Sequence, residues 1–410
     1  MRRRTFFLGI LSALIVGLSP AGGPVYSRFG IGDLLSFGSN RANGMGIMGY
    51  ALRGDGFINL ANPAGLSGLT YTRIAGGFDY RTLSLRDDSG SQRFATGGFQ
   101  SLALAVPVAD SAGVVLFAGA VPYSIVAYDV RVQSFAGSAS VNQRMSGTGG
   151  LSTLNLGGSF RLSHDVTLGV AFSYYYGTIH RRLEVDFNDD SFASTEVRTT
   201  LSHKGPGFTL GMTYGGIGSL FGTPSLPLTL GLVFTTPASL SVKEETLLLT
   251  ERTADTTQTR RGSARLPAGI GLGLAYDGTG FALSGDLALQ DWSSANFFET
   301  PSVQVRNSLR AAAGIEFKAK QDPITYWDRV AYRAGFAYTS SYIAVNGQPI
   351  NSWALSGGVV LPIGPDARMS VDLTAGSRGT TDRGLVRETF FRLSVSVDAS
   401  EVWFVTIEED

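Results

Sequence analysis

Three arginines stand where they could bind a carboxylate. Arg306, Arg310 and Arg333 fall on stretches in which polar and apolar residues alternate, and each lies on the polar side of its stretch. A guanidinium group can hold a carboxylate through two parallel hydrogen bonds, so these arginines are candidate contacts for an anionic ligand. They could equally pair with carboxylates such as Glu316 and Asp286, or with an N-terminal segment, and this structural role is the one we favour.

The sequence offers little other chemistry. The chain contains no cysteine, which excludes disulfides, thiolate metal sites, cysteine catalysis and a lipoprotein anchor. The three histidines, His164, His180 and His203, show no spacing typical of a metal site, and no stretch resembles a nucleophile elbow or a phosphate-binding loop. We therefore expect no enzyme activity, cofactor or metal. Lys+Arg and Asp+Glu both number 33, and a chain without a basic excess is not suited to bind nucleic acid.

From Tyr71 onward apolar and polar residues alternate along the chain with a period of two. In 391–398, for example, one face carries Phe391, Leu393, Val395 and Val397, and the other carries Arg392, Ser394, Ser396 and Asp398. One apolar and one polar face is the pattern of a membrane β-barrel with lipid outside and a wet lumen. A soluble sandwich has the same alternation, so the period alone does not decide between the two.

The lengths of the connections favour the barrel. We expect strands near 71–85, 92–108, 113–134, 147–162, 165–186, 194–214, 226–241, 262–277, 280–292, 303–318, 328–341, 352–362, 366–377 and 385–398. Tight turns follow most even-numbered strands, and long polar links follow odd-numbered ones, as at 135–146, 242–261, 293–302 and 342–351. Short turns on one rim and long loops on the other are typical of outer-membrane barrels. The prediction is an all-β, transmembrane, antiparallel β-barrel of about 14 strands with an N-terminal plug in its lumen.

We divide the chain into four parts. Residues 1–23 form a signal peptide, because three arginines precede a short apolar run and small residues suited to cleavage. Residues 24–70 lack strand alternation and form the plug, or hatch. Its central motif is Asn62-Pro63-Ala64, in which Asn62 can cap a helix and Pro63 can occupy the first helical position. Residues 71–400 form the barrel and 401–410 a tail, in which Trp403-Phe404 is a candidate assembly signal.

Two features concern the barrel wall. Aromatic residues near the expected rims suit the membrane–water boundary, among them Trp292, Tyr342 and Trp353. Pro122 falls inside the long third strand, shortly after Gly119, and a proline removes a hydrogen bond of the ladder. Pro122 therefore marks either a local break in the wall, with Gly119 and Pro122 as its kink, or a loop stem just beyond the membrane.

The chain resembles the FadL-type family of outer-membrane transporters for long-chain fatty acids and other hydrophobic compounds. Asn62-Pro63-Ala64 is similar to the motif in that family's hatch. The stretches 266–276, with Asp291-Trp292-Ser293, and 332–338 are similar to its recurring C-terminal strands. The resemblance implies a fourteen-stranded barrel filled by a hatch, capture of a hydrophobic ligand at the outer face, and lateral release beside a kink in the third strand.

These observations predict a passive transporter of hydrophobic ligands in the cell outer membrane. Long-chain fatty acids are the expected ligand, with lateral release through the barrel wall. The expected partners are outer-membrane lipid, a hydrophobic small molecule and the outer-membrane assembly machinery. The alternative is a FadL-like barrel that anchors or shuttles secreted proteins. A passive porin for polar solutes is disfavoured, because it would need an open and charged constriction.

Overall fold

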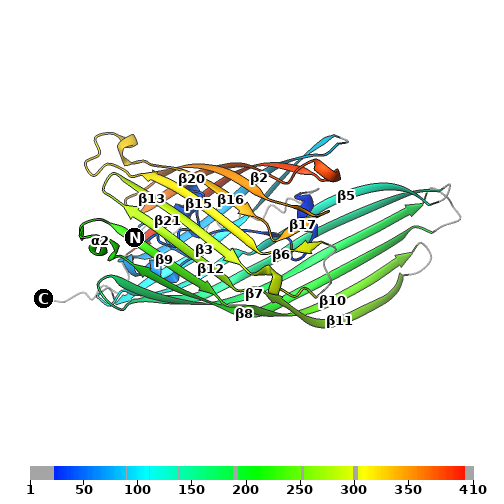
Figure 1. Cartoon of the computed structure of the whole chain (residues 1–410), viewed down its shortest axis with the longest axis horizontal. Coiled ribbons are helices and arrows are strands. Elements are labelled where there is room, and N and C mark those ends of the chain that lie inside the picture. The colour runs from blue at the N-terminus through cyan, green and yellow to red at the C-terminus, as the bar shows by residue number, and fades with distance from the viewer. Residues whose placement is uncertain are drawn as a thin grey trace, which may run out of the picture.

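The computed structural model describes residues 23–88, 90–109, 111–136, 139–187, 193–250, 254–298 and 303–401. The predicted signal peptide, except for Gly23, and Trp403-Phe404 lie outside these residues. The described part is an antiparallel β-barrel around a short N-terminal segment, drawn in dark blue in Figure 1. None of its helices is long and apolar enough to cross a membrane.

The barrel wall has fourteen strands, as predicted. In chain order they are β2 (Thr72–Arg86), β3 (Ser91–Ala109), β4 (Val114–Pro122) with β5 (Ser124–Ala136), β6 (Ala139–Arg161), β7 (Val166–Phe187), β8 (Thr195–Tyr214), β9 (Leu228–Thr235) with β10 (Ala238–Thr250), β11 (Ala254–Leu266) with β12 (Gly269–Asp277), β13 (Phe281–Gln290), β15 (Ser308–Phe317), β16 (Ala331–Ser340), β19 (Ser352–Pro362), β20 (Ala367–Arg378) and β21 (Arg387–Glu401). Three wall strands are interrupted, and each consists of two segments: β4 and β5, β9 and β10, and β11 and β12. The first strand, β2, pairs with the last, β21, from Thr72↔Glu401 to Arg86↔Arg387, which closes the ring.

The side chains alternate between the two faces of the wall as the sequence predicted. Outward positions carry large apolar residues that are about half exposed, such as Leu156 at 57% and Leu210 at 50%. Inward positions carry small and polar residues that are buried, such as Ser173 and Asp286. An apolar outside and a polar inside is the arrangement that lipid around the barrel requires.

Strands β5 to β8, β10 and β11 extend far beyond the others at one end of the barrel (Figure 1). The predicted long links 135–146 and 242–261 were therefore wrong, because these residues belong mostly to the paired strands β5–β6 and β10–β11. Above the membrane both faces of a strand can be polar, and the apolar alternation that identifies a strand in sequence is then lost. Pairing with neighbouring strands maintains the extended conformation there.

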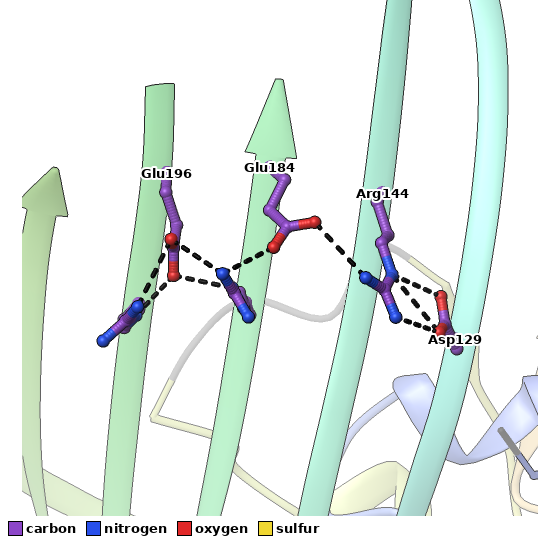
Figure 2. Close-up of polar contacts among 6 residues, drawn as sticks. Asp129, Arg144, Glu184 and Glu196 are labelled. Carbon is purple, nitrogen blue, oxygen red and sulfur yellow. Dashed lines mark hydrogen bonds and ion pairs between the residues drawn. The ribbon is translucent and has the colours of Figure 1, made fainter. Parts of the chain in front are cut away.

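A chain of charged residues crosses the outward face of this extension (Figure 2). Arg144 on β6 donates to Asp129 on β5 at 2.6 Å and lies 3.7 Å from Glu184 on β7. The chain continues from Glu184 through Arg182 to Glu196 and Arg198 on β8. The hydrogen bond from Arg144 holds the pKa of the Asp129 carboxyl below its usual range. These contacts join four strands outside the membrane.

The outer end of the lumen is covered by an apolar cluster. Trp292, in the 3₁₀ helix η3 (Trp292–Ser294), is fully buried, and its ring stacks on Tyr342 with 4.3 Å between centroids. Tyr26 and Phe29, in and just after the 3₁₀ helix η1 (Val25–Arg28), pack in the same cluster. Trp292 and Tyr342 were predicted at the membrane–water boundary, and this was wrong, because the connections that carry them fold inward. Trp353 is 47% exposed on the outer face, as that prediction requires.

Candidate functional site

The N-terminal segment, residues 23–71, lies inside the ring of strands. The short helix α1 (Asn40–Gly44) contacts β16, β19 and β20, and the 3₁₀ helix η2 (Pro63–Gly68) contacts β4, β6, β7 and β8 on the other side of the lumen. Apolar side chains of the segment, among them Met45, Leu52 and Leu66, pack against small inward-facing residues of the wall. The segment therefore spans the lumen from one wall to the other.

Acidic side chains of the wall hold α1 in place. Asn40 donates to Asp398 on β21 at 2.7 Å, and Asn43 donates to Asp372 on β20 at 3.2 Å. Arg41 lies 2.9 Å from Glu316 on β15. Three polar contacts to three wall strands fix both the position and the rotation of this helix.

A fourth carboxylate binds the backbone that follows α1. Asp286 on β13 accepts hydrogen bonds from the N–H groups of Met48, Gly49 and Tyr50 at 2.9, 2.6 and 3.3 Å. Its side chain is buried. One carboxylate thus satisfies three donors that have no place in a ladder or helix, and it connects the middle of the segment to the wall.

The Asn62-Pro63-Ala64 motif connects the segment to the opposite side of the wall. Asn62 caps η2 by accepting a hydrogen bond from Ala64 N–H at 3.0 Å, and Pro63 begins the helix, as the sequence predicted. The Asn62 amide also donates to Tyr50 O at 2.6 Å and to Met212 O on β8 at 3.2 Å. The motif therefore both starts a helix and contacts the wall.

The barrel wall has a gap between β3 and the third wall strand. β3 pairs with β4 from Ala109 up to Leu102↔Ala120, and no described strand pairs with this edge of β3 above that level. The third strand breaks after Pro122, which pairs with Ser152 of β6, and continues as β5, which also pairs with β6. The pairing Ala120↔Leu154 puts the bottom of the gap level with an outward-facing leucine, within the apolar belt.

Two glycines allow the wall to bend at this level. Gly149 and Gly150 of β6, opposite the break, have φ angles of 107° and 139°, in the region that side-chain-bearing residues avoid. A Cβ at Gly150 would lie 2.2 Å from Ser124 O. Gly119, predicted to share the kink with Pro122, is instead paired on both sides within β4, and its missing side chain makes room for Leu60 of the N-terminal segment.

The N-terminal segment covers the lower part of the gap from inside. Its two-residue strand β1 (Asp33–Leu34) pairs with β5 at Ile125 and Ser124, on the edge that faces β3. Leu35 N–H donates to Tyr123 O at 2.9 Å. Asp33 is held in turn by Arg378 of β20 at 2.7 Å. This strand takes a pairing position that β3 would occupy in an unbroken wall.

A cavity of about 430 Å³ lies in the lumen beside the break. Pro122 and Tyr123 of the break, Phe37 and Leu60 of the N-terminal segment, and Tyr342 of the outer cluster line it. The cavity thus has the packed N-terminal segment on one side, the outer apolar cluster on another, and the broken wall strand on a third.

The structure separates the three arginines predicted to contact a carboxylate. Arg333 donates to Glu316 at 2.7 Å and to Asn40 O at 3.2 Å, which is the structural role that the sequence favoured. Arg310 donates to Gly46 O at 2.9 Å and lines the cavity. Arg306 was expected on a lumen-facing strand, but it precedes β15 in a connection, and it is not among the residues that line the cavity.

Sequence reasoning missed two further arginines. Arg81 on β2 and Arg392 on β21 are directly paired across the seam that closes the barrel, and both line the cavity. Arg392 donates to Asn43 at 3.2 Å and lies 3.9 Å from Asp79, whereas Arg81 has no hydrogen-bond or ion-pair partner within the described ranges. Alternation places both on inward faces, but it gives no sign that strands 300 residues apart in sequence would bring them together.

Several solved structures share this fold. A FadL homologue from Pseudomonas aeruginosa superposes with a TM-score of 0.60 at 15% identity and covers 91% of this chain and 100% of that one. The toluene transporter TodX from Pseudomonas putida gives 0.59 at 16% identity over 91% and 100%, and TbuX, the toluene transporter from Ralstonia pickettii, gives 0.56 at 14% over 90% and 99%. A sequence search of curated proteins finds no relative.

The protein thus has the FadL-type fold, and its belt of exposed apolar residues is that of a membrane β-barrel. The model of the BamG family matches residues 4–408, nearly the whole chain. The chain belongs to the BamG family.

Proposed function

We propose that this protein is a passive channel that takes a hydrophobic ligand into the barrel and releases it sideways into the membrane. The single observation that carries the proposal is the cavity beside the gap. The N-terminal segment packs across the lumen, whereas the bottom of the gap between β3 and the third wall strand lies within the apolar belt. A ligand in the cavity therefore lies beside the gap, and the packed segment stands between it and the inner end of the barrel.

The energetics of an apolar ligand favour a side exit. Exposing one buried CH₂ group to water costs about 0.8 kcal/mol, so a long alkyl chain that crossed an aqueous pore would meet a large barrier. A path from the cavity through the gap would keep most of the chain in contact with apolar side chains or lipid. This route needs no energy source, because the ligand moves down its own gradient.

Long-chain fatty acids are the proposed ligand. Arg81 and Arg392 face the cavity as a directly opposed pair of like charges, an arrangement that a nearby anion stabilises. Asp79, which lies 3.9 Å from Arg392, supplies one negative charge for the two cations. Arg310 and Arg378 also line the cavity, and Arg378 is paired there with Asp33 and Glu388. A carboxylate beside these groups would form charge-assisted hydrogen bonds, while Leu60 and Tyr123 would contact the alkyl chain.

In this proposal residues 24–70 act as a hatch and residues 71–400 as the channel wall. The hatch would control access through its contacts with the wall at α1, Asp286 and Asn62. Pro122 would keep the lateral exit open, because a continuous third strand could pair with β3 over its whole length.

The test is uptake of a fluorescent long-chain fatty acid by cells that display the protein. We expect uptake above an empty-vector control, a loss of most of it in the Arg81→Gln/Arg392→Gln variant, and a reduction in Pro122→Val. The matched control is Pro237→Val, because this proline also interrupts a wall strand but both halves of that strand are paired on both sides. Equal uptake by all variants that are folded in the outer membrane would refute the lateral route and the arginine site.

A second candidate function is to bind the outer-membrane assembly machinery, or to anchor or shuttle secreted proteins. The family name suggests the first, and exposed apolar residues in two connections on the short-turn rim favour a protein partner. Leu220 and Phe221 are 71% and 75% exposed, and Ile324 and Trp327 are 93% and 66% exposed. Co-purification of assembly components that is lost in Phe221→Ser and Trp327→Ser, with fatty-acid uptake unchanged, would support this role. Unchanged co-purification in both variants would exclude this rim as the contact.

A further inference from the structure

The gap leaves two strand edges unpaired. Residues 91–99 of β3 pair with β2 on one side, and on the other side no described strand pairs with them. Residues 129–134 of β5 pair with β6 and likewise have no described partner on the side toward β3. A closed barrel normally has no free edges, and an unpaired row of N–H and C=O groups is a template for another strand.

Nearer the break, the same side of β5 already accepts an added strand. β1 of the N-terminal segment pairs with β5 at Ile125 and Ser124, and Leu35 N–H bonds to Tyr123 O. The ion-pair chain from Asp129 to Arg144 fixes β5 against β6, so the edge is held in an extended conformation even though only one side is paired. Both edges are therefore preorganised for strand addition, which lowers the entropic cost of binding.

The side chains along the edges restrict what can bind. Near the membrane, β3 presents Phe99 and Leu102 outward, each 50% exposed. Farther out, Arg93 on β3 and Arg131 on β5 are exposed, and neither forms an ion pair with any residue that the structure describes. A complementary strand is apolar at its membrane end and carries acidic residues beyond it. A free fatty acid has none of the backbone groups that these edges can bind.

We propose that the two edges, 91–99 and 129–134, bind an extended strand of another outer-membrane protein by β-strand addition. Backbone hydrogen bonds would supply affinity, and the apolar-to-acidic pattern of the incoming strand would supply specificity. The gap would then serve a second purpose besides ligand release, as a docking place for a strand that has not yet found its own partner.

The test uses a synthetic peptide of about twelve residues, which at roughly 3.3 Å per residue follows the β3 edge. The peptide alternates apolar residues with threonine at one end and glutamate at the other. Its one central cysteine is activated as a thiopyridyl disulfide, so the protein thiolate attacks it and releases thiopyridone without an added oxidant. The protein has no cysteine, so Ala95→Cys introduces a single thiol on the exposed outward face of the β3 edge. The control is Thr148→Cys on β6, which is also exposed and outward but is paired on both sides by β5 and β7.

We expect disulfide formation with Ala95→Cys to be at least tenfold faster than with Thr148→Cys. Two further peptides, N-methylated on alternate residues, keep the side chains but remove the donors on one side of the strand. With at least one of these methylated peptides, reaction at Ala95→Cys should no longer be tenfold faster than reaction at Thr148→Cys. Equal reaction at both cysteines, or a preference that survives both methylation patterns, would overturn the proposal. Fatty-acid uptake is measured separately on the unmodified protein, so failure of one proposal leaves the other unaffected.

Discussion

The contact between Asp286 and the N-terminal segment allows a quantitative test of how the segment is held. Asp286→Ala removes the acceptor of three hydrogen bonds from Met48, Gly49 and Tyr50 and leaves three backbone N–H groups unsatisfied. The neighbouring wall should not change, because β13 keeps its backbone pairing with β12 and β15. The expected effect is local opening of residues 48–50 and not unfolding of the barrel.

The magnitude follows from the burial and the number of bonds. A hydrogen bond to a charged group contributes about 1.5–3 kcal/mol, but three bonds that share one carboxylate are not additive. Leaving a buried N–H group without an acceptor costs about 1–3 kcal/mol, and because the three effects are not additive we expect a total of about 3–5 kcal/mol. Since 1.4 kcal/mol corresponds to a factor of ten, amide exchange at residues 48–50 should accelerate roughly 140- to 3,700-fold. Asp286→Asn keeps one carbonyl oxygen and should give a smaller acceleration.

Amide hydrogen exchange of the purified barrel in detergent, followed by mass spectrometry, measures this directly. Exchange in β12, which pairs with β13, should stay as in the unsubstituted protein. Asp366→Ala is the control, because Asp366 is an exposed carboxylate in a turn of the short-turn rim. Exchange at 48–50 within threefold of the unsubstituted protein would refute the conclusion that Asp286 anchors the segment.

Three further predictions concern the same structure. Gly335→Ala should speed amide hydrogen exchange around Met45. A Cβ at Gly335 would lie 1.7 Å from Met45 O, so the N-terminal segment would have to move away. Unchanged exchange would contradict this close contact. Trp292→Ala should lower the stability of the outer apolar cluster by about 3–5 kcal/mol in denaturant unfolding, since the side chain is fully buried. The lowered pKa of Asp129 means that its contact with Arg144 stabilises the extension above the usual aspartate pKa of about 4 and is lost as pH falls through the folded-state value. The midpoint temperature of thermal unfolding should therefore change little between pH 7 and 5, and it should decrease at pH values below about 4. Arg144→Gln should reduce this dependence on pH.

Much of the wall could be predicted from the sequence because its signal is local. A strand that crosses lipid must alternate apolar and polar residues, so stretches such as 391–398 identify both the strand and its outward face. The sequence signal for the start of η2 is equally local, because Asn62 caps a helix that begins at the next residue. The extension at 135–146 was missed because, outside lipid, nothing requires that alternation.

The site depends on contacts that no local pattern contains. Asn40 meets Asp398 across 358 positions of sequence, and Arg81 meets Arg392 only because the first and last strands close the ring. The sequence marked Pro122 as an irregularity, but only the strand pairing shows that the wall opens there and that β1 pairs with the edge of β5. Alternation determines which face of a strand is polar. Closure of the barrel decides which polar residues neutralise each other and which face the cavity.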